Sequence, residues 1–555
     1  MLAKFSNAIQ GEGNVVMNQF FINDDISEEQ KKLLHKVLDL GIDFLDGNIR
    51  QGKALNYLDM GELKQKFSSE IPTDSSDYDS LYSMLHEISK YSISQSAHTF
   101  LAFPDSAGSL ATYCADIIAS FLNQNLIAVD RSAPVATYVE AQLIAWLRYL
   151  IGYSDTSINQ AHSLSEVGGM WTTGGNMSNH IAILTALLTK FPEIMNYGLC
   201  SLEKRPVIIV SKEIAHYSFL AAARILGIGS ENVVWAETTR EFTSDVDSIK
   251  YCLDHLNDDC VPFMVVAVAG NCRTSAIDDL YSIAKICEEK NIWFHVDACH
   301  GGSLLFSNSL KSLLRGIEVA DSVTIDPHKG LFTTYSSSYV LFKDTSVMNK
   351  YCRYPEKTLQ TDIFDLGLIT PFYGSRGFES LKLWLLIKHL GVKKIGEIVE
   401  QRNNYFSNLT AIIDSTGYFC SLSKSTFYRA VYVFYPDVIR SCVDELKLSA
   451  HDIKNYIDKY TVLFSEKLYT RGNVIFDLFS LKDVDNSVGL GNGITYKVIG
   501  VCCGHAEMSI EDFRFIEKEI RIVSEKIQVL MLNELKGSNL DIIEPKSLES
   551  GPASW

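Results

Sequence analysis

Two neighbouring segments near the middle of the chain decide the fold: FHVDACHGG at residues 294–302 and DSVTIDPHKG at residues 321–330. Each begins as a short apolar strand and ends in polar residues where the strand meets a loop. In open α/β sheets, ligands bind at the carboxyl ends of the strands. Asp297 ends one strand and Lys329 follows another, 32 residues later, so we expect both side chains at the same edge of one sheet.

Apolar runs and helical patterns alternate on the amino-terminal side of these segments as well. The predicted strands are residues 207–210, 233–235, 263–269, 292–296 and 323–325, and the predicted helices between them are 219–226, 246–256 and 280–289. This alternation favours a largely parallel sheet with helices on both faces. The strands are apolar throughout, as in sheets that are buried on both sides. The sequence therefore predicts an α/β fold with a mainly parallel central sheet.

The regions on either side of this α/β pattern have different sequence patterns. Ser27-Glu28-Glu29-Gln30 is a capping box that opens an amphipathic helix to about Asp46. Further helices are expected at 110–122 and 135–151, and a helix at 381–390 leads into a second α/β region that ends near residue 533. We therefore predict an N-terminal helical segment (1–96), a large α/β domain (97–385), a small C-terminal α/β domain (386–535) and a polar tail (536–555).

Composition narrows the class of protein. The 555 residues are 46% hydrophobic and 21% charged, as in a globular protein, and the net charge of −17 argues against nucleic acid or an anionic membrane as partner. No apolar run is long enough to span a membrane. The twelve cysteines show no metal-ligand spacing, and the start MLAKFSNAIQGEGN lacks the apolar core of a secretory signal. Buried, reduced thiols and a cytoplasmic location are the expectation.

HVDACHGGS followed by DPHKG resembles the group II pyridoxal phosphate (PLP) dependent decarboxylases, which include the aromatic amino acid, glutamate, cysteine sulfinate and diaminobutyrate decarboxylases. The similarity runs from about Ala97 to about Leu390, and more weakly to about Asn533. It implies a fold-type I PLP-dependent transferase fold, PLP as cofactor and loss of CO₂ from an L-amino acid. It also implies a homodimer that buries the N-terminal helices against the partner.

The resemblance assigns the central chemistry to Lys329 and Asp297. Lys329 would form an imine with the cofactor aldehyde, and Asp297 would keep the pyridine nitrogen protonated so that the ring can accept electrons. The competing interpretations are a surface lysine and a carboxylate that serves a helix cap or a structural ion pair. His216, beyond the strand 207–210, would stack on the ring and could take part in proton transfer.

Further cofactor contacts follow from the same resemblance. The Gly174-Gly175 pair precedes a helix, and helix N-termini bind anions, so this segment would hold the phosphate. His328 would help to hold the phosphate or orient the imine. Cys299 stands under the ring where the family usually has alanine, and Asn271 would hydrogen-bond Asp297 or the cofactor. The expected phosphate ligands are Gly175, Asn176, Met177 and Ser178.

The substrate side is less specific. Phe103 and Pro104 resemble the motif that lines the pocket entrance, and Lys497 is the nearest match to an arginine that binds the substrate carboxylate in the family. Residues 348–365 correspond to a mobile loop, in which Tyr351 or Tyr354 would return a proton; Tyr354 is the catalytic candidate. Ser132–Pro134 would approach a subunit boundary, and Arg376 is expected to be structural. An aldehyde synthase on the same scaffold and a non-catalytic regulatory subunit stay open as alternatives.

Overall fold

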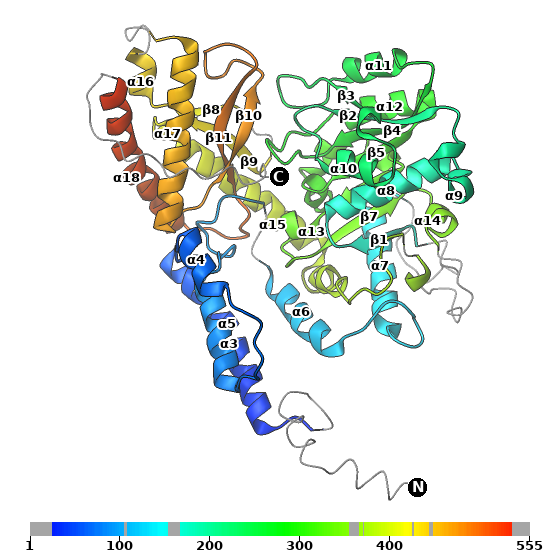
Figure 1. Cartoon of the computed structure of the whole chain (residues 1–555), viewed down its shortest axis with the longest axis horizontal. Helices are drawn as coiled ribbons and strands as arrows, with labels where there is room; N and C mark the ends of the chain where they lie inside the picture. Colours follow the sequence, from blue (N-terminus) through cyan, green and yellow to red (C-terminus); the bar gives the residue numbers. More distant parts are fainter. Residues whose placement is uncertain are drawn as a thin grey trace, which may run out of the picture. The chain divides into compact units, whose positions relative to one another are not determined.

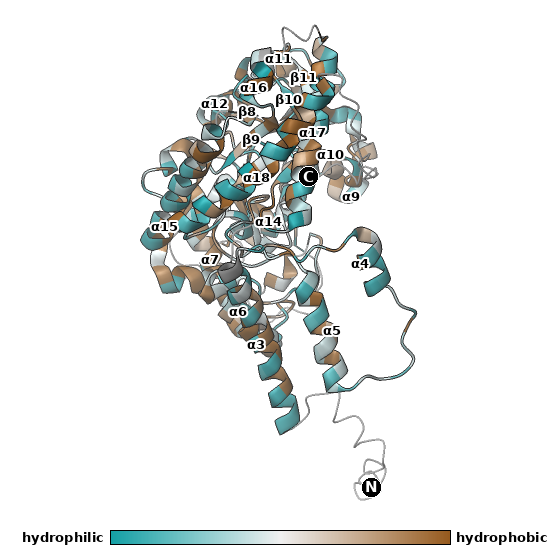
Figure 2. Ribbon diagram, turned by 90° about the vertical axis from the view of Figure 1, so that its left-hand side faces the viewer, coloured by the Kyte–Doolittle hydropathy of each residue, from teal (hydrophilic) through white to brown (hydrophobic). Residues whose placement is uncertain are grey.

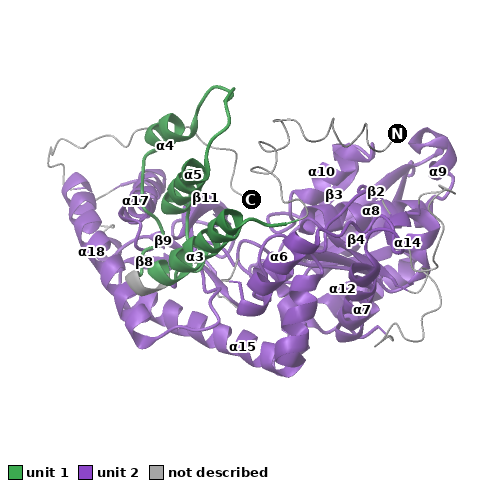
Figure 3. Ribbon diagram, turned by 90° about the horizontal axis from the view of Figure 1, so that it is seen from below, with its two compact units in different colours: residues 1–97 green, residues 98–555 purple. Residues whose placement is uncertain are grey.

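The computed structural model describes residues 25–104, 108–153, 167–353, 366–369, 371–423, 427–442 and 448–535. The chain divides into two compact units, residues 1–97 and 98–555 (Figure 3). The second unit contains two separate β-sheets, one of seven strands and one of four. The predicted boundary near residue 385 lies inside this unit, in a long helix, and it stays a prediction.

The first unit consists of α3 (Glu28–Gln51), α4 (Met60–Phe67) and α5 (Tyr78–Tyr91). The predicted capping box is present at the start of α3: the Ser27 hydroxyl accepts from the Gln30 amide and the Gln30 side chain accepts from the Ser27 amide. α3 packs against α5, yet apolar side chains of both helices stay open to solvent. Hydrophobic and hydrophilic residues alternate along α3 (Figure 2).

The seven-stranded sheet has the order β1-β7-β6-β5-β4-β2-β3 (Figure 1). Its strands are β1 (Gly169–Thr172), β2 (Arg205–Ser211), β3 (Val233–Ala236), β4 (Cys260–Val268), β5 (Trp293–Ala298), β6 (Ser322–Ile325) and β7 (Ser338–Phe342). Strands β3, β2, β4, β5 and β6 are parallel, and β7 runs antiparallel to both of its neighbours. All five predicted strands are present, and the mainly parallel α/β fold is confirmed.

Helices cover both faces of this sheet. α8 (Gly175–Lys190) packs across β1, β7, β6, β5 and β4 and contacts α10 (Ser218–Ile225). α11 (Val246–Asp254) and α12 (Leu280–Lys290) contact each other and the strands β2 to β5. Because crossovers between parallel strands are right-handed, α8 and α10 lie on the face opposite α11 and α12. The carboxyl ends of β1, β2, β4, β5 and β6 therefore meet at one edge.

The four-stranded antiparallel sheet has the order β10-β11-β9-β8. It is formed by β8 (Phe419–Ser421), β9 (Arg429–Phe434), β10 (Asp477–Asp483) and β11 (Ile494–Cys502), with α17 (Ala450–Arg471) packed on it and α18 (Ile510–Leu535) packed on α17. α15 (Leu381–Ser415) leads into this region. It breaks at Gly391, which has φ 73°, directly after the predicted helix end at Leu390.

Two further helices of the large region were predicted closely: α6 (Leu110–Leu122) and α7 (Pro134–Ile151). Pro134 occupies the first position of α7, where its missing N–H removes no helical hydrogen bond. Arg376 forms a buried ion pair with Glu140 of α7, which agrees with a structural role. No helix among the described residues is both long enough and apolar enough to cross a membrane.

Candidate active site

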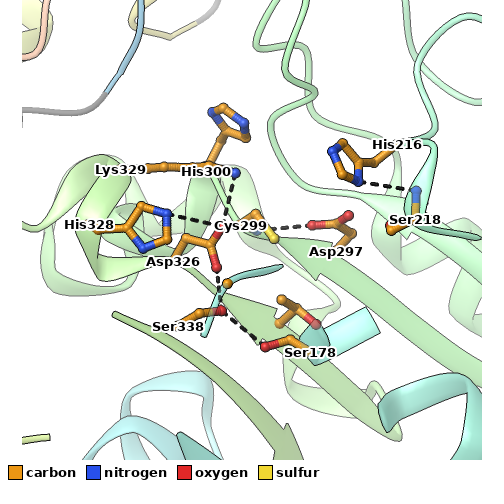
Figure 4. A network of polar contacts seen from close by, with 12 residues as sticks. Ser178, His216, Ser218, Asp297, Cys299, His300, Asp326, His328, Lys329 and Ser338 are labelled. Carbon is orange, nitrogen blue, oxygen red and sulfur yellow. Dashed lines mark hydrogen bonds and ion pairs between the residues drawn. The ribbon is translucent and has the colours of Figure 1, made fainter. Parts of the chain in front are cut away.

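A cavity at the carboxyl edge of the parallel strands brings together six of the ten predicted cofactor residues: Lys329, Asp297, His216, Gly175, Asn176 and Cys299. Its empty volume, open solvent included, is about 340 Å³. The residues that line it come from the strand ends and from the start of α8: Gly175, Asn176, Ile214, His216, Val268, Gly270, Cys272, Asp297, Cys299, His300 and Lys329. Several of their side chains form one network of polar contacts (Figure 4).

Lys329 lies in the short helical turn α13 (Pro327–Gly330), which follows β6. Its Nζ is 2.9 Å from Oδ2 of Asp326, and the side chains are 21% and 1% exposed respectively. Burial by itself would lower the pKa of Lys329, but the adjacent carboxylate of Asp326 outweighs it and holds that pKa well above the ordinary value. Lys329 is thus a partly buried, charged group and not an ordinary surface lysine.

Asp297 stands at the end of β5 and is anchored on both oxygens. The side-chain amide of Asn179 donates to Oδ2 at 2.9 Å, and the backbone N–H of Cys299 donates to Oδ1 at 3.1 Å. Asn179 is itself fully buried, and its Oδ1 accepts from Thr324 at 2.9 Å and lies 3.2 Å from Nε2 of His295. The orientation of the Asp297 carboxylate is therefore set by a network that spans α8, β5 and β6.

His216 follows β2 and lines the cavity beside Lys329 and Asp297. Burial lowers the pKa of His216 to about 4, although the carboxylate of Asp297 opposes the shift, so the imidazole is neutral at pH 7. The backbone N–H of Ser218 donates to Nδ1 at 3.3 Å, which places the ring proton on Nε2. A flat, neutral ring with this tautomer suits stacking on an aromatic ring.

The start of α8 contributes the expected anion site. The helix begins at Gly175, so the amides of its first turn have no carbonyl partner within the helix and the helix dipole favours an anion there. Gly175 packs tightly: a Cβ at this position would collide with Sγ of Cys299 and would lie 2.7 Å from Oδ2 of Asp326. The hydroxyl of Ser178 lies 2.7 Å from Oγ1 of Thr172 and 3.0 Å from Oγ of Ser338.

Other predicted cofactor residues lie near the cavity with other partners. Asn271 uses its side chain within its own loop, where it donates to the carbonyl of Phe242 and accepts from the amide of Thr274. The amide that bonds to Asp297 is therefore Asn179 and not Asn271. His328 Nδ1 is 2.6 Å from the carbonyl oxygen of Ser337, and His328 does not line the described cavity. Cys299 does line it, and burial raises the pKa of its thiol well above the ordinary value.

The predicted substrate residues, unlike most of the predicted cofactor residues, lie outside the cavity. Lys497 is exposed in β11, and its Nζ donates to Ser480 at 3.1 Å. Phe103 is half-buried with its ring 6.3 Å from that of Phe100, and Pro104 is buried. None of these three residues lines the described cavity. Tyr351 ends α14 (Ser346–Tyr351), whereas Tyr354 lies outside the described residues.

Three residues that the sequence analysis left without a role belong to this site: Asn179, Asp326 and His300. His300 lines the cavity and hydrogen-bonds through Nδ1 to the Tyr428 hydroxyl. Asp326 opens the quoted segment DPHKG, three residues before Lys329, which is one helical turn. That spacing was a usable signal for the ion pair, whereas no local pattern pairs Asn179 with a residue 118 positions away.

This arrangement is that of PLP-dependent enzymes of fold type I. The model of the family described as "Pyridoxal-dependent decarboxylase conserved domain" matches residues 61–431, more than half of the chain. The chain therefore belongs to the pyridoxal-dependent decarboxylases, and its cofactor is PLP.

Comparisons with single proteins agree. The acidic amino acid decarboxylase GADL1 of Xenopus tropicalis is 28% identical over 402 residues, which cover 71% of this chain and 76% of that protein. The aromatic-L-amino-acid decarboxylase of Bacillus atrophaeus is 25% identical over 518 residues, which cover 91% and 97%. The crystal structure of mouse CSAD superposes with a TM-score of 0.79 at 23% identity over 89% of this chain and 98% of that one, a likeness of fold.

The described residues fit PLP chemically. The cavity holds an amine for an aldehyde (Lys329), an anchored carboxylate for a ring nitrogen (Asp297) and a helix start for a phosphate (Gly175). The close approach of Gly175 to Cys299 leaves no room for a side chain at the helix start. Among the described residues, no group of three or more His, Cys, Asp or Glu side chains could hold a metal ion.

Proposed function

We propose that this protein removes the α-carboxyl group of an L-amino acid as CO₂ and releases the amine. The observation that carries the proposal is the convergence of Lys329, Asp297 and His216 on one cavity at the carboxyl edge of the sheet. When bound, PLP supplies a ring that takes up the electron pair left behind as CO₂ departs. The protein supplies binding, orientation and the exclusion of water around that event.

Each group has a distinct task in this proposal. Lys329 holds the cofactor covalently until the substrate amine replaces it. Asp297, fixed by Asn179, accepts a hydrogen bond from the pyridine N–H and keeps that nitrogen protonated, since an anchored carboxylate favours a facing cation. His216 stacks on the ring as a neutral imidazole. Backbone amides at Gly175 and Asn176 and the hydroxyl of Ser178 hold the phosphate, whereas the amide of Met177, which was also expected to do so, donates to the Gly174 carbonyl at 3.0 Å.

The return of a proton to the α-carbon separates decarboxylation from the alternative, aldehyde synthesis. Tyr354 remains our candidate for the donor, with His216 as the group in the described site that could also carry a proton. A tyrosine hydroxyl next to the reacting carbon favours simple decarboxylation over diversion to oxygen. The products distinguish the two outcomes, because only the aldehyde synthase releases an aldehyde and ammonia.

We further propose a homodimer in the cytoplasm. α3 exposes Leu34, Leu38 and Ile42, and α5 exposes Leu81, Met84 and Ile88. An apolar face of this kind suits a protein interface and is an aggregation hazard when left open. The cytoplasmic location rests on the cysteine pattern, which shows no disulfide framework. The relatives named above leave the substrate open, and an L-amino acid is the class we propose.

The proposal is tested by incubating the purified protein and PLP with the twenty amino acids, diaminobutyrate and DOPA. We expect CO₂ and the matching amine in equal amounts from at least one of them. Lys329→Ala serves as the control that lacks the covalent attachment point. Aldehyde and ammonia in place of the amine would establish the synthase instead, and the absence of both PLP binding and turnover would leave a non-catalytic member of the family.

A further inference from the structure

Asp326 is the centre of a continuous chain of polar contacts that links Lys329 to the start of α8 (Figure 4). Its Oδ2 is 2.9 Å from Nζ of Lys329, and its Oδ1 accepts a hydrogen bond from the Ser338 hydroxyl. Ser338 Oγ is 3.0 Å from Ser178 Oγ. The chain therefore connects two groups that the cofactor needs, the amine of Lys329 and the hydroxyl of Ser178.

The direction of these hydrogen bonds follows from the charge of Asp326. Burial would raise the pKa of Asp326, but the ammonium of Lys329 outweighs it and the net pKa is lowered, so the carboxylate is ionised and can only accept. Ser338 donates its single proton to Asp326. It therefore accepts from Ser178, whose own proton is then committed to Ser338 and not to a phosphate.

Asp326 also lies inside the expected anion cradle. A Cβ at Gly175 would be 2.7 Å from Oδ2 of Asp326, so the carboxylate adjoins the first residue of α8. The helix start attracts a negative charge, and in this structure the carboxylate is the nearest one. A phosphate in the same cradle would meet a like charge at short range, which disfavours its binding.

We propose that Asp326 is a positioning residue. Before PLP binds, Asp326 pairs with the groups of the site that PLP would engage, and it thereby limits how fast and how tightly the site takes up PLP. It holds the Lys329 amine in an ion pair, commits the Ser178 hydroxyl through Ser338, and places a negative charge beside Gly175. The inference rests on the proposed function in one respect, namely that the phosphate lies at the start of α8.

The attachment step shows why the ion pair matters. The nitrogen lone pair of Lys329 attacks the aldehyde carbon, a carbon–nitrogen double bond forms, and the aldehyde oxygen leaves as water. The ammonium must first lose a proton to solvent to expose that lone pair. Asp326 stabilises the ammonium form, and each unit by which its removal lowers the pKa of Lys329 raises the free-amine fraction about tenfold.

Asp326 is not the only group that acts on Lys329. The titratable groups that face Lys329 from the surrounding elements are Asp297, Cys299, His216, Tyr217, His300 and Tyr428. His328 shares the turn α13, and its Nε2 is 3.8 Å from Oδ2 of Asp326. Among the described residues, the carboxylate that forms an ion pair with Nζ of Lys329 belongs to Asp326, at 2.9 Å, so Asp326 is the carboxylate to replace.

The test compares cofactor capture by the cofactor-free wild type and Asp326→Asn. The matched control is Asp321→Asn at the opposite end of β6, where the side chain accepts from the Phe294 amide at 2.8 Å. Capture is followed by the absorbance of the covalently bound cofactor from pH 6.5 to 9, with PLP and, separately, with pyridoxal, which lacks the phosphate. Borohydride reduction and peptide mass spectrometry verify attachment at Lys329.

We expect Asp326→Asn to capture both compounds about tenfold faster or more near pH 7, with the larger gain for PLP. Its rate should level off at a lower pH than that of the wild type, because the pKa of Lys329 has lost its main support. Ser338→Ala frees the Ser178 hydroxyl and keeps the ion pair, so it should speed the capture of PLP and leave pyridoxal unchanged. Asp321→Asn should behave as the wild type.

Equal or slower capture by a folded Asp326→Asn would overturn the inference and would make Asp326 a structural support of α13. Circular dichroism establishes the folded state. If Asp326→Asn does not fold, an unchanged rate of PLP capture by Ser338→Ala would likewise overturn the inference. A wild type that takes up no PLP at all would refute the proposed function, which is a distinguishable result.

Discussion

The side-chain amide of Asn179 donates to Oδ2 of Asp297 at 2.9 Å, across 118 residues of sequence. Asn179 belongs to the first turns of α8, whose start is the proposed phosphate site, and Asp297 lies at the end of β5 and lines the cavity. One buried side chain therefore joins the two ends of the proposed cofactor site.

Replacing Asn179 with alanine should weaken both the site and the fold. Asp297, Thr324 and His295 would each lose a buried partner, and leaving a buried polar group unsatisfied costs about 1–3 kcal/mol. We expect a lower urea midpoint and a lower PLP affinity, measured by equilibrium unfolding and absorbance titration. Asn257→Ala, on an exposed loop, is the control. Wild-type PLP affinity in Asn179→Ala would show that Asp297 keeps its place without it.

Replacing Lys329 with alanine should abolish covalent capture of PLP and turnover. The change should also affect the fold, because Lys329 forms an ion pair with buried Asp326. Removing one partner of a buried pair costs about 3–5 kcal/mol, because the other charge is left uncompensated. Adding Asp326→Asn should restore most of the lost stability and none of the activity. Unfolding curves of the two variants measure the difference, and near-normal decarboxylation by Lys329→Ala would remove our central claim.

Replacing Asp297 with asparagine should leave PLP bound and lower the decarboxylation rate by orders of magnitude. A neutral amide does not keep the ring nitrogen protonated, and the ring then accepts electrons poorly. Single-turnover kinetics at saturating PLP measure the chemical step apart from binding. Asp321→Asn is the control, because it makes the same aspartate-to-asparagine change at a residue outside the cavity. If most of the rate survived in Asp297→Asn, Asp297 would be a structural residue.

Acid should destabilise the protein between about pH 6.5 and pH 4 through His295 and His216. Burial lowers the pKa of each to about 4, whereas an unfolded histidine titrates near 6.5. In this window the unfolded state binds more protons, so the free energy of unfolding falls as the pH falls. Urea unfolding at pH 7.5, 6 and 5 should show a smaller loss in His295→Gln than in the wild type. A parallel pH dependence in both proteins would contradict the assignment.

Asp278 has the opposite effect on the free energy of unfolding in part of the same pH range. Burial raises its pKa to about 6, although three hydrogen bonds from Ser244 and Val268 oppose the shift. The folded state then holds the extra proton between about pH 4 and pH 6, and its contribution to stability grows as the pH falls. The comparison with His295→Gln is needed because it separates the contribution of His295 to the pH dependence from that of Asp278.

A chain that begins at about residue 97 should aggregate or lose PLP. Leu38 and Ile42 of α3 are 43% and 53% exposed, and Met84 and Ile88 of α5 are 49% and 51% exposed. We expect these side chains to be covered in the homodimer, with Ser132–Pro134 near the partner's site. Light scattering and PLP absorbance on the full and shortened chains test this. A shortened chain that stays monomeric, soluble and active would show that the first 96 residues have no part in the interface.

Local sequence was sufficient for α3 and for most of the helices and parallel strands between residues 110 and 325, but it predicted no individual strands for the four-stranded sheet. The capping box at Ser27 marks the start of α3, and the helix limits at 110–122 match α6, because capping and periodicity are properties of adjacent residues. The strands β1 and β7 were not predicted. Both are short, and β7 is antiparallel to its neighbours, so neither fits the repeating pattern that identifies the parallel strands.

The sequence by itself determined the class of enzyme through the resemblance of HVDACHGGS and DPHKG to the group II decarboxylases. Because Asp297, Lys329 and His216 each follow a strand and the Gly174-Gly175 pair precedes a helix, the sequence also predicted that these residues meet at one edge of an open parallel sheet. Only the tertiary structure decided which groups these residues contact. Asn179 takes the place at Asp297 that was expected of Asn271, and Lys497 lies on an exposed strand surface instead of in the cavity. The physical reason is that side-chain pairing between distant segments depends on the registers of β5, β6 and α8 relative to one another, which no local pattern encodes.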